Sequence, residues 1–196
     1  MAKPLVGVLA LQGAFREHLE TLRRLGVPAK EIRQLKDLEG VDAFVLPGGE
    51  STTIGKLLTD LEIMPALREK IGAGAPAFGT CAGMILLCDR IEGSDQPRIG
   101  GLDATVRRNA FGSQVDSFEE DLAVKGLGDA PYRAVFIRAP LITETGPAVD
   151  VLATVSQRGR REAVAIRQGN LLAASFHPEL TRDDRLHEYF LRMCEA

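Results

Sequence analysis

A cysteine at a sharp bend is the residue of this chain best suited to covalent chemistry. Cys81 follows one short apolar run and precedes another with helical character, and Gly79 and Gly83 flank it. The pattern Gly-x-Cys-x-Gly is the cysteine version of a nucleophile elbow, in which a strand-to-helix turn exposes the sulfur. The N–H of the next residue, Ala82, then helps to form an oxyanion hole. We therefore predict that Cys81 is a nucleophile; the alternative is a cysteine buried in the core.

A histidine far along the chain is suited to activating that thiol. His177 follows an apolar, strand-like run, and Glu179 lies two residues beyond it. A histidine can take the proton of a thiol and later give it to a leaving amine, while a carboxylate orients the ring. Cys81, His177 and Glu179 in this order predict an acyl-transfer triad. The alternative for His177 is a surface histidine in a turn, and this is our interpretation of His18 and His187, which lie in helical segments beside glutamates.

A glycine pair follows another apolar, strand-like run. Gly48 and Gly49 precede Glu50, and two glycines let backbone N–H groups approach a ligand closely. We predict that Gly49 supplies the second donor of the oxyanion hole. The alternative is a tight turn with a serine or threonine helix cap. A nucleotide-binding P-loop is excluded because Leu57 stands where that motif needs serine or threonine. An uncharged or zwitterionic substrate fits the loop better.

The composition limits the class of protein. The chain has 196 residues, 45% of them hydrophobic, which suffices for one domain with its own core. Its net charge is −3 and it has no long basic tract, so nucleic acid is not an expected partner. Its three cysteines predict neither a disulfide framework nor a zinc site, and we interpret Cys88 and Cys194 as core residues. The apolar run 5–11 is too short for a membrane span, so we expect a soluble cytoplasmic protein that is not exported.

The candidate residues follow predicted strands of an α/β protein. In the first half of the chain, apolar runs alternate with helical spacing, which favours a parallel sheet with helical crossovers. In the second half, short β-like runs between Gly, Pro and charged residues favour hairpins. We predict one domain over residues 1–196 with a mixed sheet edge. The expected strands are 5–11, 43–46, 77–78, 104–108, 134–137, 151–155, 163–167 and 171–175, and the expected helices are 15–25, 53–73, 82–88 and a last one ending near Met193.

Several motifs together resemble the class I, or triad-type, glutamine amidotransferases, whose fold is a flavodoxin-like three-layer α/β sandwich with a mostly parallel central sheet. The cysteine elbow and the His-Pro-Glu motif belong to the whole class. Within the class, the match is closest to the glutaminase subunits of pyridoxal 5′-phosphate synthases and runs almost from end to end. The motifs that carry the resemblance are 7–14, 46–53, 78–83, 93–95, 108–109, 111–112, 114–118, 136–140 and 175–181.

The resemblance implies a glutaminase that hydrolyses L-glutamine to L-glutamate and ammonia through a thioester on Cys81, with His177 as acid and base and Glu179 as its orienting group. It implies that the ammonia passes to a separate synthase subunit, which condenses it with a pentose phosphate and a triose phosphate into pyridoxal 5′-phosphate. No metal or other cofactor is implied. The resemblance assigns glutamine binding to Gly48, Gly49, Glu50, Arg108, Ile137 and Arg138, and it places Gln12 near the partner interface, where it helps to set the oxyanion loop.

The charges of the candidate binding residues agree with glutamine as the substrate. Free glutamine carries an α-carboxylate and an α-ammonium group, and Arg108 or Arg138 suits the first while Glu50 suits the second.

Two other functions stay open. The chain is either a glutaminase subunit that feeds another synthase, such as one in histidine biosynthesis, or a non-catalytic redox-sensing or chaperone-like relative with a reactive elbow cysteine. His177 and Glu179 argue against the second. The segment 157–162, with three arginines between Arg158 and Arg161, matches none of the motifs, and a solvated hairpin tip is the preferred interpretation.

Overall fold

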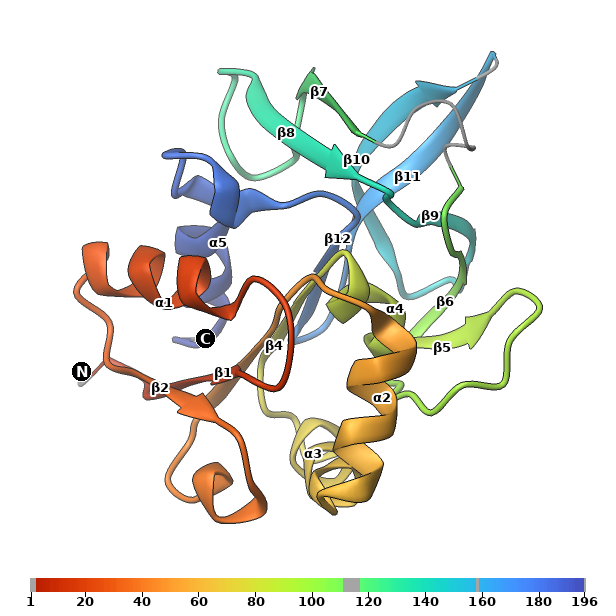
Figure 1. Ribbon diagram of the computed structural model, residues 1–196. Coiled ribbons are helices and arrows are strands. Elements are labelled where there is room, and N and C mark those ends of the chain that lie inside the picture. Colours follow the sequence, from red (N-terminus) through yellow and green to blue (C-terminus); the bar gives the residue numbers. More distant parts are fainter. Residues whose placement is uncertain (1–2, 111–116, 158, 196) are drawn as a thin grey trace.

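One large sheet runs through the molecule, and helices pack on both of its faces (Figure 1). The computed structural model describes residues 3–110, 117–157 and 159–195. The strands are β1 (Val6–Leu9), β2 (Ala29–Ile32), β3 (Ala43–Leu46), β4 (Ala77–Thr80), β5 (Cys88–Ile91), β6 (Leu102–Arg107), β7 (Ser117–Leu122), β8 (Tyr132–Ile137), β9 (Leu141–Thr145), β10 (Asp150–Gln157), β11 (Arg160–Gln168) and β12 (Leu171–Ala174). The helices are α1 (Phe15–Arg24), α2 (Ser51–Asp60), α3 (Ile63–Gly72), α4 (Ala82–Leu87) and α5 (Arg185–Met193), with short 3-10 turns η1 (Leu35–Leu38) and η2 (Pro178–Leu180).

Five neighbouring strands of the sheet run parallel, in the order β2-β1-β3-β4-β12. This is the 2-1-3-4-5 order of flavodoxin-like folds, so the expected α/β class is confirmed. Beyond β12 the sheet continues through the antiparallel strands β11, β9 and β6 to β5. A long hairpin pairs β10 with β11, and β7 pairs with β8 in a separate two-stranded sheet. The antiparallel region lies where hairpins were expected.

Alternation along the parallel strands divides their side chains between two cores. On β3, Ala43 and Val45 pack with residues of α1 and α5, whereas Phe44 and Leu46 pack with α2, α3 and α4. Successive side chains of a strand point to opposite faces, so a run that is apolar throughout suits a sheet covered on both sides. Figure 1 shows α1 and α5 on one side of the sheet and α2 and α3 on the other. These are the three layers of the fold.

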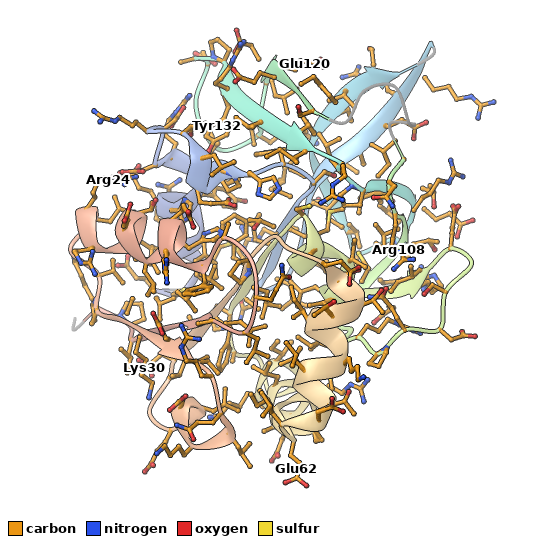
Figure 2. The ribbon with its side chains drawn as sticks, in the orientation of Figure 1. Arg24, Lys30, Glu62, Arg108, Glu120 and Tyr132 are labelled. Atoms are coloured by element: carbon orange, nitrogen blue, oxygen red, sulfur yellow. The ribbon has the colours of Figure 1, made fainter. Side chains whose placement is uncertain are left out.

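Some elements differ from the expectation. The helix expected over 53–73 is two helices, α2 and α3, because Glu62 between them has a left-handed backbone with φ of 57° and ends the helical path (Figure 2). The helix expected over 82–88 ends at Leu87, since Cys88 has extended angles and begins β5. Four strands were not predicted, namely β2, β5, β7 and β9.

The segment with the arginines forms the tip of the β10–β11 hairpin, as expected. Gly159, Arg160 and Arg161 are exposed there, and Arg161 donates hydrogen bonds to the hydroxyl of Thr154. Arg158 lies outside the described residues, as does the part of the family-like motifs that falls in 111–116. Among the described helices, none has the length and apolar composition needed to cross a bilayer.

Candidate active site

Loops that follow β1, β3, β4 and β12 meet at the carboxyl edge of the sheet, around a pocket of about 340 Å³. In a sheet of this order, ligands bind at the carboxyl ends of the strands, where the strand order reverses. That point lies between β1 and β3. The predicted site residues that line the pocket are Gln12, Gly49, Glu50, Cys81, Arg108, Ile137, Arg138 and His177.

The backbone of Cys81 forms the bend between β4 and α4, with φ of 48° and ψ of −104°. A residue with a side chain is strained in this conformation. Glycines make the bend sterically possible, because a Cβ on Gly83 would overlap the carbonyl of Leu46, and one on Gly79 would overlap the backbone of Gly83. The sulfur lies 4.0 Å from the carbonyl oxygen of Ile137. The elbow therefore presents a thiol at the pocket.

The backbone N–H of Ala82 lies in the first turn of α4. The first hydrogen bond of this helix runs from the N–H of Ile85 to the carbonyl of Cys81, at 3.2 Å. N–H groups that precede the fourth helical position have no acceptor within their own helix. The N–H of Ala82, next to the sulfur in the chain, is therefore a candidate donor to a ligand.

The ring of His177 lies between the thiol and a buried carboxylate. Its Nδ1 is 2.7 Å from Oε1 of Glu179, and the ring also interacts with the side chain of Cys81. Burial by itself lowers the pKa of His177, but the hydrogen bonds with Cys81 and Glu179 and their charges outweigh burial and raise the pKa to about 10. The ring therefore carries a proton on both nitrogens at neutral pH.

The carboxyl of Glu179 is only 5% exposed. Burial raises its pKa, but interactions with His18 and His177 outweigh burial, and the pKa lies below its usual value. Glu179 is therefore an anion beside the imidazolium, which fixes the ring with Nδ1 toward the carboxylate.

The loop after β3 is held by the loop after β1. The side-chain oxygen of Gln12 accepts the N–H of Glu50 at 2.7 Å. The carbonyl of Gly48 accepts the N–H of Ala14 at 3.0 Å. The peptide bond between Gly48 and Gly49 is trans, so the N–H of Gly49 points in the opposite direction to the carbonyl of Gly48 and away from Ala14.

Both glycines of this loop are required by close packing. A Cβ on Gly48 would overlap the ring of His177 and press on Cys81, and one on Gly49 would overlap the side chain of Gln12. The loop therefore lies directly against Cys81 and His177, which an ordinary turn would not need to do.

A model of the SNO glutamine amidotransferase family matches residues 8–196. The chain belongs to this family. The pyridoxal 5′-phosphate synthase subunit PdxT of Moorella thermoacetica is 55% identical over 188 residues, which cover 96% of this chain and 98% of the relative. The subunit of the same name from Thermus thermophilus is 57% identical over 190 residues, which cover 96% of each chain. A crystal structure described as a glutamine amidotransferase has a TM-score of 0.90 and 53% identity, and the match covers 97% of this chain and 99% of that one.

In this family member, a half-buried arginine and an acidic side chain face the pocket from neighbouring elements. Arg108 donates from Nη1 to the side-chain oxygen of Gln96 at 2.7 Å and to the hydroxyl of Thr52 at 2.8 Å. The carboxylate of Glu50 accepts the N–H groups of Thr52 and Thr53 and so caps α2. The loop is thus also a capped turn, but its cap is Glu50, not the serine or threonine of the alternative interpretation.

Ile137 and Arg138 form the opposite wall of the pocket. Arg138 is exposed and has a left-handed backbone with φ of 42°, directly after the end of β8. This turn brings the carbonyl of Ile137 to the sulfur of Cys81 and leaves the guanidinium of Arg138 beside the pocket.

Gln96 was not predicted from the sequence, although it directly follows the motif 93–95. It is 8% exposed, and its side-chain oxygen accepts hydrogen bonds from Ser51, Thr52 and Arg108. The signal that could have identified Gln96 was its position as a polar residue next to a family motif. Gln96 holds Arg108 against the first turn of α2.

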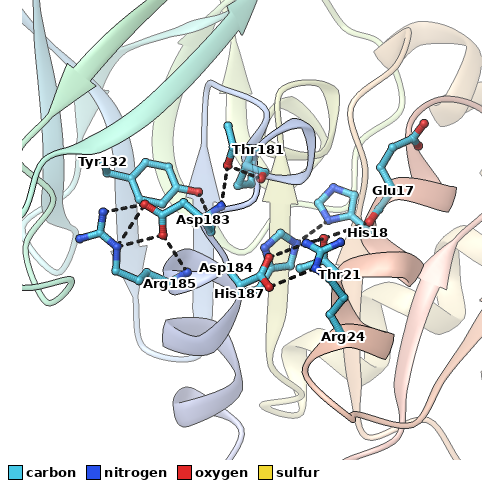
Figure 3. A network of polar contacts seen from close by, with 11 residues as sticks. Glu17, His18, Thr21, Arg24, Tyr132, Thr181, Asp183, Asp184, Arg185 and His187 are labelled. Atoms are coloured by element: carbon cyan, nitrogen blue, oxygen red, sulfur yellow. Dashed lines mark hydrogen bonds and ion pairs between the residues drawn. The ribbon is translucent and has the colours of Figure 1, made fainter.

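The expectation that His18 and His187 lie on the surface is wrong, because both are fully buried. His18 is on α1 and His187 on α5, and Nδ1 of the first is 2.9 Å from Nε2 of the second (Figure 3). Nε2 of His18 lies 3.2 Å from the hydroxyl of Thr80 and 3.3 Å from Oε2 of Glu179. The two histidines therefore belong to the interior behind the triad.

Helical spacing was the signal that these two positions are buried. His18 precedes the buried Leu22 by four residues, and His187 precedes the buried Phe190 by three. Positions with this spacing share one helix face. The neighbouring glutamates that suggested exposure lie on other faces of the same helices.

Within the described part of the chain, no group of three or more His, Cys, Asp or Glu side chains is arranged to hold a metal ion. All three cysteines are free. Burial raises the pKa of Cys88 and of Cys194 to about 12, which makes both thiols unreactive. Cys81 is the cysteine at the pocket.

Proposed function

We propose that this chain is the glutaminase subunit of a pyridoxal 5′-phosphate synthase, working in the cytoplasm as a single class I amidotransferase domain over residues 1–196. Relatives named as subunits of that synthase share 55–57% of its residues over nearly the full length. The observation that carries the proposal is the buried imidazole of His177, which lines the same pocket as Cys81 and lies 2.7 Å from the carboxylate of Glu179.

The first half of the proposed reaction forms a thioester. The nucleophilic form of a cysteine is the thiolate. The thiolate of Cys81 attacks the side-chain amide carbon of glutamine, and the N–H groups of Gly49 and Ala82 stabilise the oxyanion. His177 then gives its proton to the leaving nitrogen, so the C–N bond breaks and ammonia departs.

The second half hydrolyses the thioester. His177, now neutral, takes a proton from a water molecule, and the resulting hydroxide attacks the same carbon. Collapse of the intermediate releases glutamate and returns the thiolate and imidazolium. Glu179 stabilises the imidazolium and holds the ring in one orientation throughout, without itself becoming protonated.

The charged residues at the pocket rim suit the polar end of glutamine. Arg108 and Arg138 are candidates for the α-carboxylate, and the carboxylate of Glu50 for the α-ammonium group. Interactions of Glu50 with Thr52 and Thr53 outweigh its burial and keep its pKa below the usual value, so it stays charged. Backbone groups of Gly48 and Ile137 complete the proposed contacts along the substrate.

We propose that the synthase subunit binds near Gln12. The side chain of Gln12 holds the N–H of Glu50, so a partner that contacts this side chain also acts on the oxyanion loop. Ammonia made without an acceptor is lost to water, and we therefore expect the free chain to hydrolyse glutamine slowly.

An assay of glutamine hydrolysis with and without the synthase subunit tests the proposal, with pyridoxal 5′-phosphate formation followed in parallel. We expect the partner to stimulate hydrolysis and the product to form from glutamine only when both chains are present. Stimulation by a different amidotransferase acceptor, with none by this synthase, would assign the chain to another pathway. A glutamine-like electrophile should label Cys81, and glutamine should protect it; labelling by peroxide alone, without protection, would indicate a redox sensor.

A further inference from the structure

The three histidines of this chain all lie in one line of buried polar groups. The line runs from His187 on α5 through His18 on α1 to Glu179 and His177, with contacts of 2.9, 3.3 and 2.7 Å, and it ends at Cys81. Burying two more imidazoles behind a triad costs free energy unless they are paired. The burial of His18 and His187 next to Glu179 and His177 therefore needs a physical explanation.

The hydrogen bonds give this line a direction. Burial lowers the pKa of His18, despite the nearby charge of Glu179, and lowers the pKa of His187 well below its usual value, so both rings are neutral. A neutral ring has one N–H. Oε2 of Glu179 accepts no well-aligned hydrogen bond within the described residues, and Nε2 of His18 is the ring nitrogen that faces it. A lone pair at that nitrogen would repel the carboxylate, so the proton of His18 belongs on Nε2.

The hydrogen bonds at His187 lead to the same tautomer of His18. With its proton on Nε2, His18 has an acceptor at Nδ1, and Nε2–H of His187 donates to it. Nδ1 of His187 is then an unprotonated acceptor, and among the described residues it has no hydrogen-bond partner. The opposite arrangement would leave a buried N–H donor unpaired at that atom, which is rarer in folded proteins. Both ends therefore select the same tautomers.

We infer that His18 is a positioning residue for Glu179, and that His187 fixes the tautomer in which His18 does this. The inference rests on the proposed function of the triad. Nε2–H of His18, shared between the hydroxyl of Thr80 and Oε2 of Glu179, holds the second oxygen of the carboxylate. The first oxygen is then left in one position for His177. The chain thus uses α1 and α5, which pack in the same core beside β12, to orient its proposed base.

Imidazole NMR of the wild-type chain tests the tautomers without any assay of activity. With only three histidines, ¹⁵N labelling of histidine gives three rings to assign. We expect two neutral rings with the proton on Nε2 and one ring, His177, protonated on both nitrogens at pH 7. A ring of His18 with its proton on Nδ1 would overturn the inference.

Two amide substitutions separate positioning from packing. Glutamine at position 18 places an N–H donor as many bonds from Cα as Nε2 of histidine, whereas asparagine reaches only as far as Nδ1. In the complex with the synthase, we expect His18→Asn to lower kcat roughly tenfold with KM little changed, and His18→Gln to stay within about threefold of wild type. The Nδ1–H proton resonance of His177 should move or broaden in the asparagine variant and persist in the glutamine variant.

A matched control lies one turn further along α1. Leu22→Val removes one methylene from the same helix face and should lower the melting temperature without changing kcat or the His177 resonance. Equal kcat values and equal resonances in the two amide variants would reduce His18 to a packing residue. A wild-type complex that does not hydrolyse glutamine would instead refute the proposed function, while the tautomers would still be decided by the NMR spectrum.

Discussion

Cys81, the proposed nucleophile, has an unfavourable backbone conformation. Its φ of 48° and ψ of −104° belong to a region that costs about 1–3 kcal/mol for a residue with a Cβ. Glycine adopts such angles without that cost. We expect Cys81→Gly to unfold at a higher temperature than Cys81→Ala, by scanning calorimetry, although both lack the thiol. Equal melting temperatures would mean that the bend stores no strain.

Loss of the sulfur should abolish turnover without unfolding the chain. Cys81→Ala removes the nucleophile but leaves a side chain of similar shape, so we expect at least a thousandfold fall in kcat with normal binding to the synthase subunit. His177→Asn should be nearly as damaging, and Glu179→Gln less so, because the glutamine can still touch the ring. Measurable thioester formation or hydrolysis by Cys81→Ala would refute the mechanism.

The proton held by His177 should make stability depend on pH. Its pKa is raised from 6.5 to about 10 in the folded chain, so folding favours the protonated ring. This contribution is fully present below about pH 6.5 and is lost as the pH rises through about 10. We expect urea unfolding of wild type to show a steeper fall in the free energy of unfolding over this range than His177→Gln. Parallel curves for the two proteins would contradict the raised pKa.

Single residues were predictable where local pattern and chemistry coincide. Cys81 could be found because glycines, strand and helix meet at one thiol, and His177 because a carboxylate follows it closely. His18 was misread, since its partners Thr80 and Glu179 are distant in the chain and become neighbours only when the sheet forms. The position of a polar residue on an apolar helix face predicts that it is buried. It does not predict its hydrogen-bond partners, because the tertiary fold brings these together.

At the scale of elements, the approach of α4 to β3 depends on Gly83. A Cβ on Gly83 would overlap the carbonyl of Leu46 on β3, and backbone atoms there cannot move aside. We expect Gly83→Ala to lower the free energy of unfolding by about 3 kcal/mol in urea titrations.

Gly72, at the end of α3, provides the control for that substitution. No atom among the described residues lies within 4 Å of a Cβ built there. Gly72→Ala should therefore leave stability unchanged or raise it by about 0.5–1 kcal/mol. A similar loss in both variants would show that helix propensity, not the contact with β3, decides the outcome.

Elements with continuous apolar runs were predictable, whereas some partly polar ones, among them β2 and β7, were not. β1, β3 and β4 are buried on both faces and read directly as strands. β2 is an edge strand with one buried residue, Ile32, and β7 alternates between exposed and half-buried residues until Leu122. Their strand conformation comes from pairing with a neighbour, which the local sequence does not encode.

At the scale of the whole molecule, sheet order brings the site together, and Gln12 links it to the proposed partner surface. Gln12→Ala removes the acceptor of the N–H of Glu50, so the oxyanion loop loses its attachment to the β1–α1 loop. We expect a fall in synthase-stimulated kcat of roughly tenfold. Gln12→Glu, which keeps an acceptor in place, is the control. Unchanged stimulation in Gln12→Ala would remove this residue from the coupling.

The position of β12 has a consequence for how the protein is made. This strand lies between β4 and β11, yet it follows every other described strand in the sequence and is made after them. Until then β4 has an open edge, and residues 175–179, which bring the imidazole and carboxylate, are still to come. Cys81 is therefore made well before its proposed base, and the proposed activation of its thiol depends on the pairing of β12 with β4.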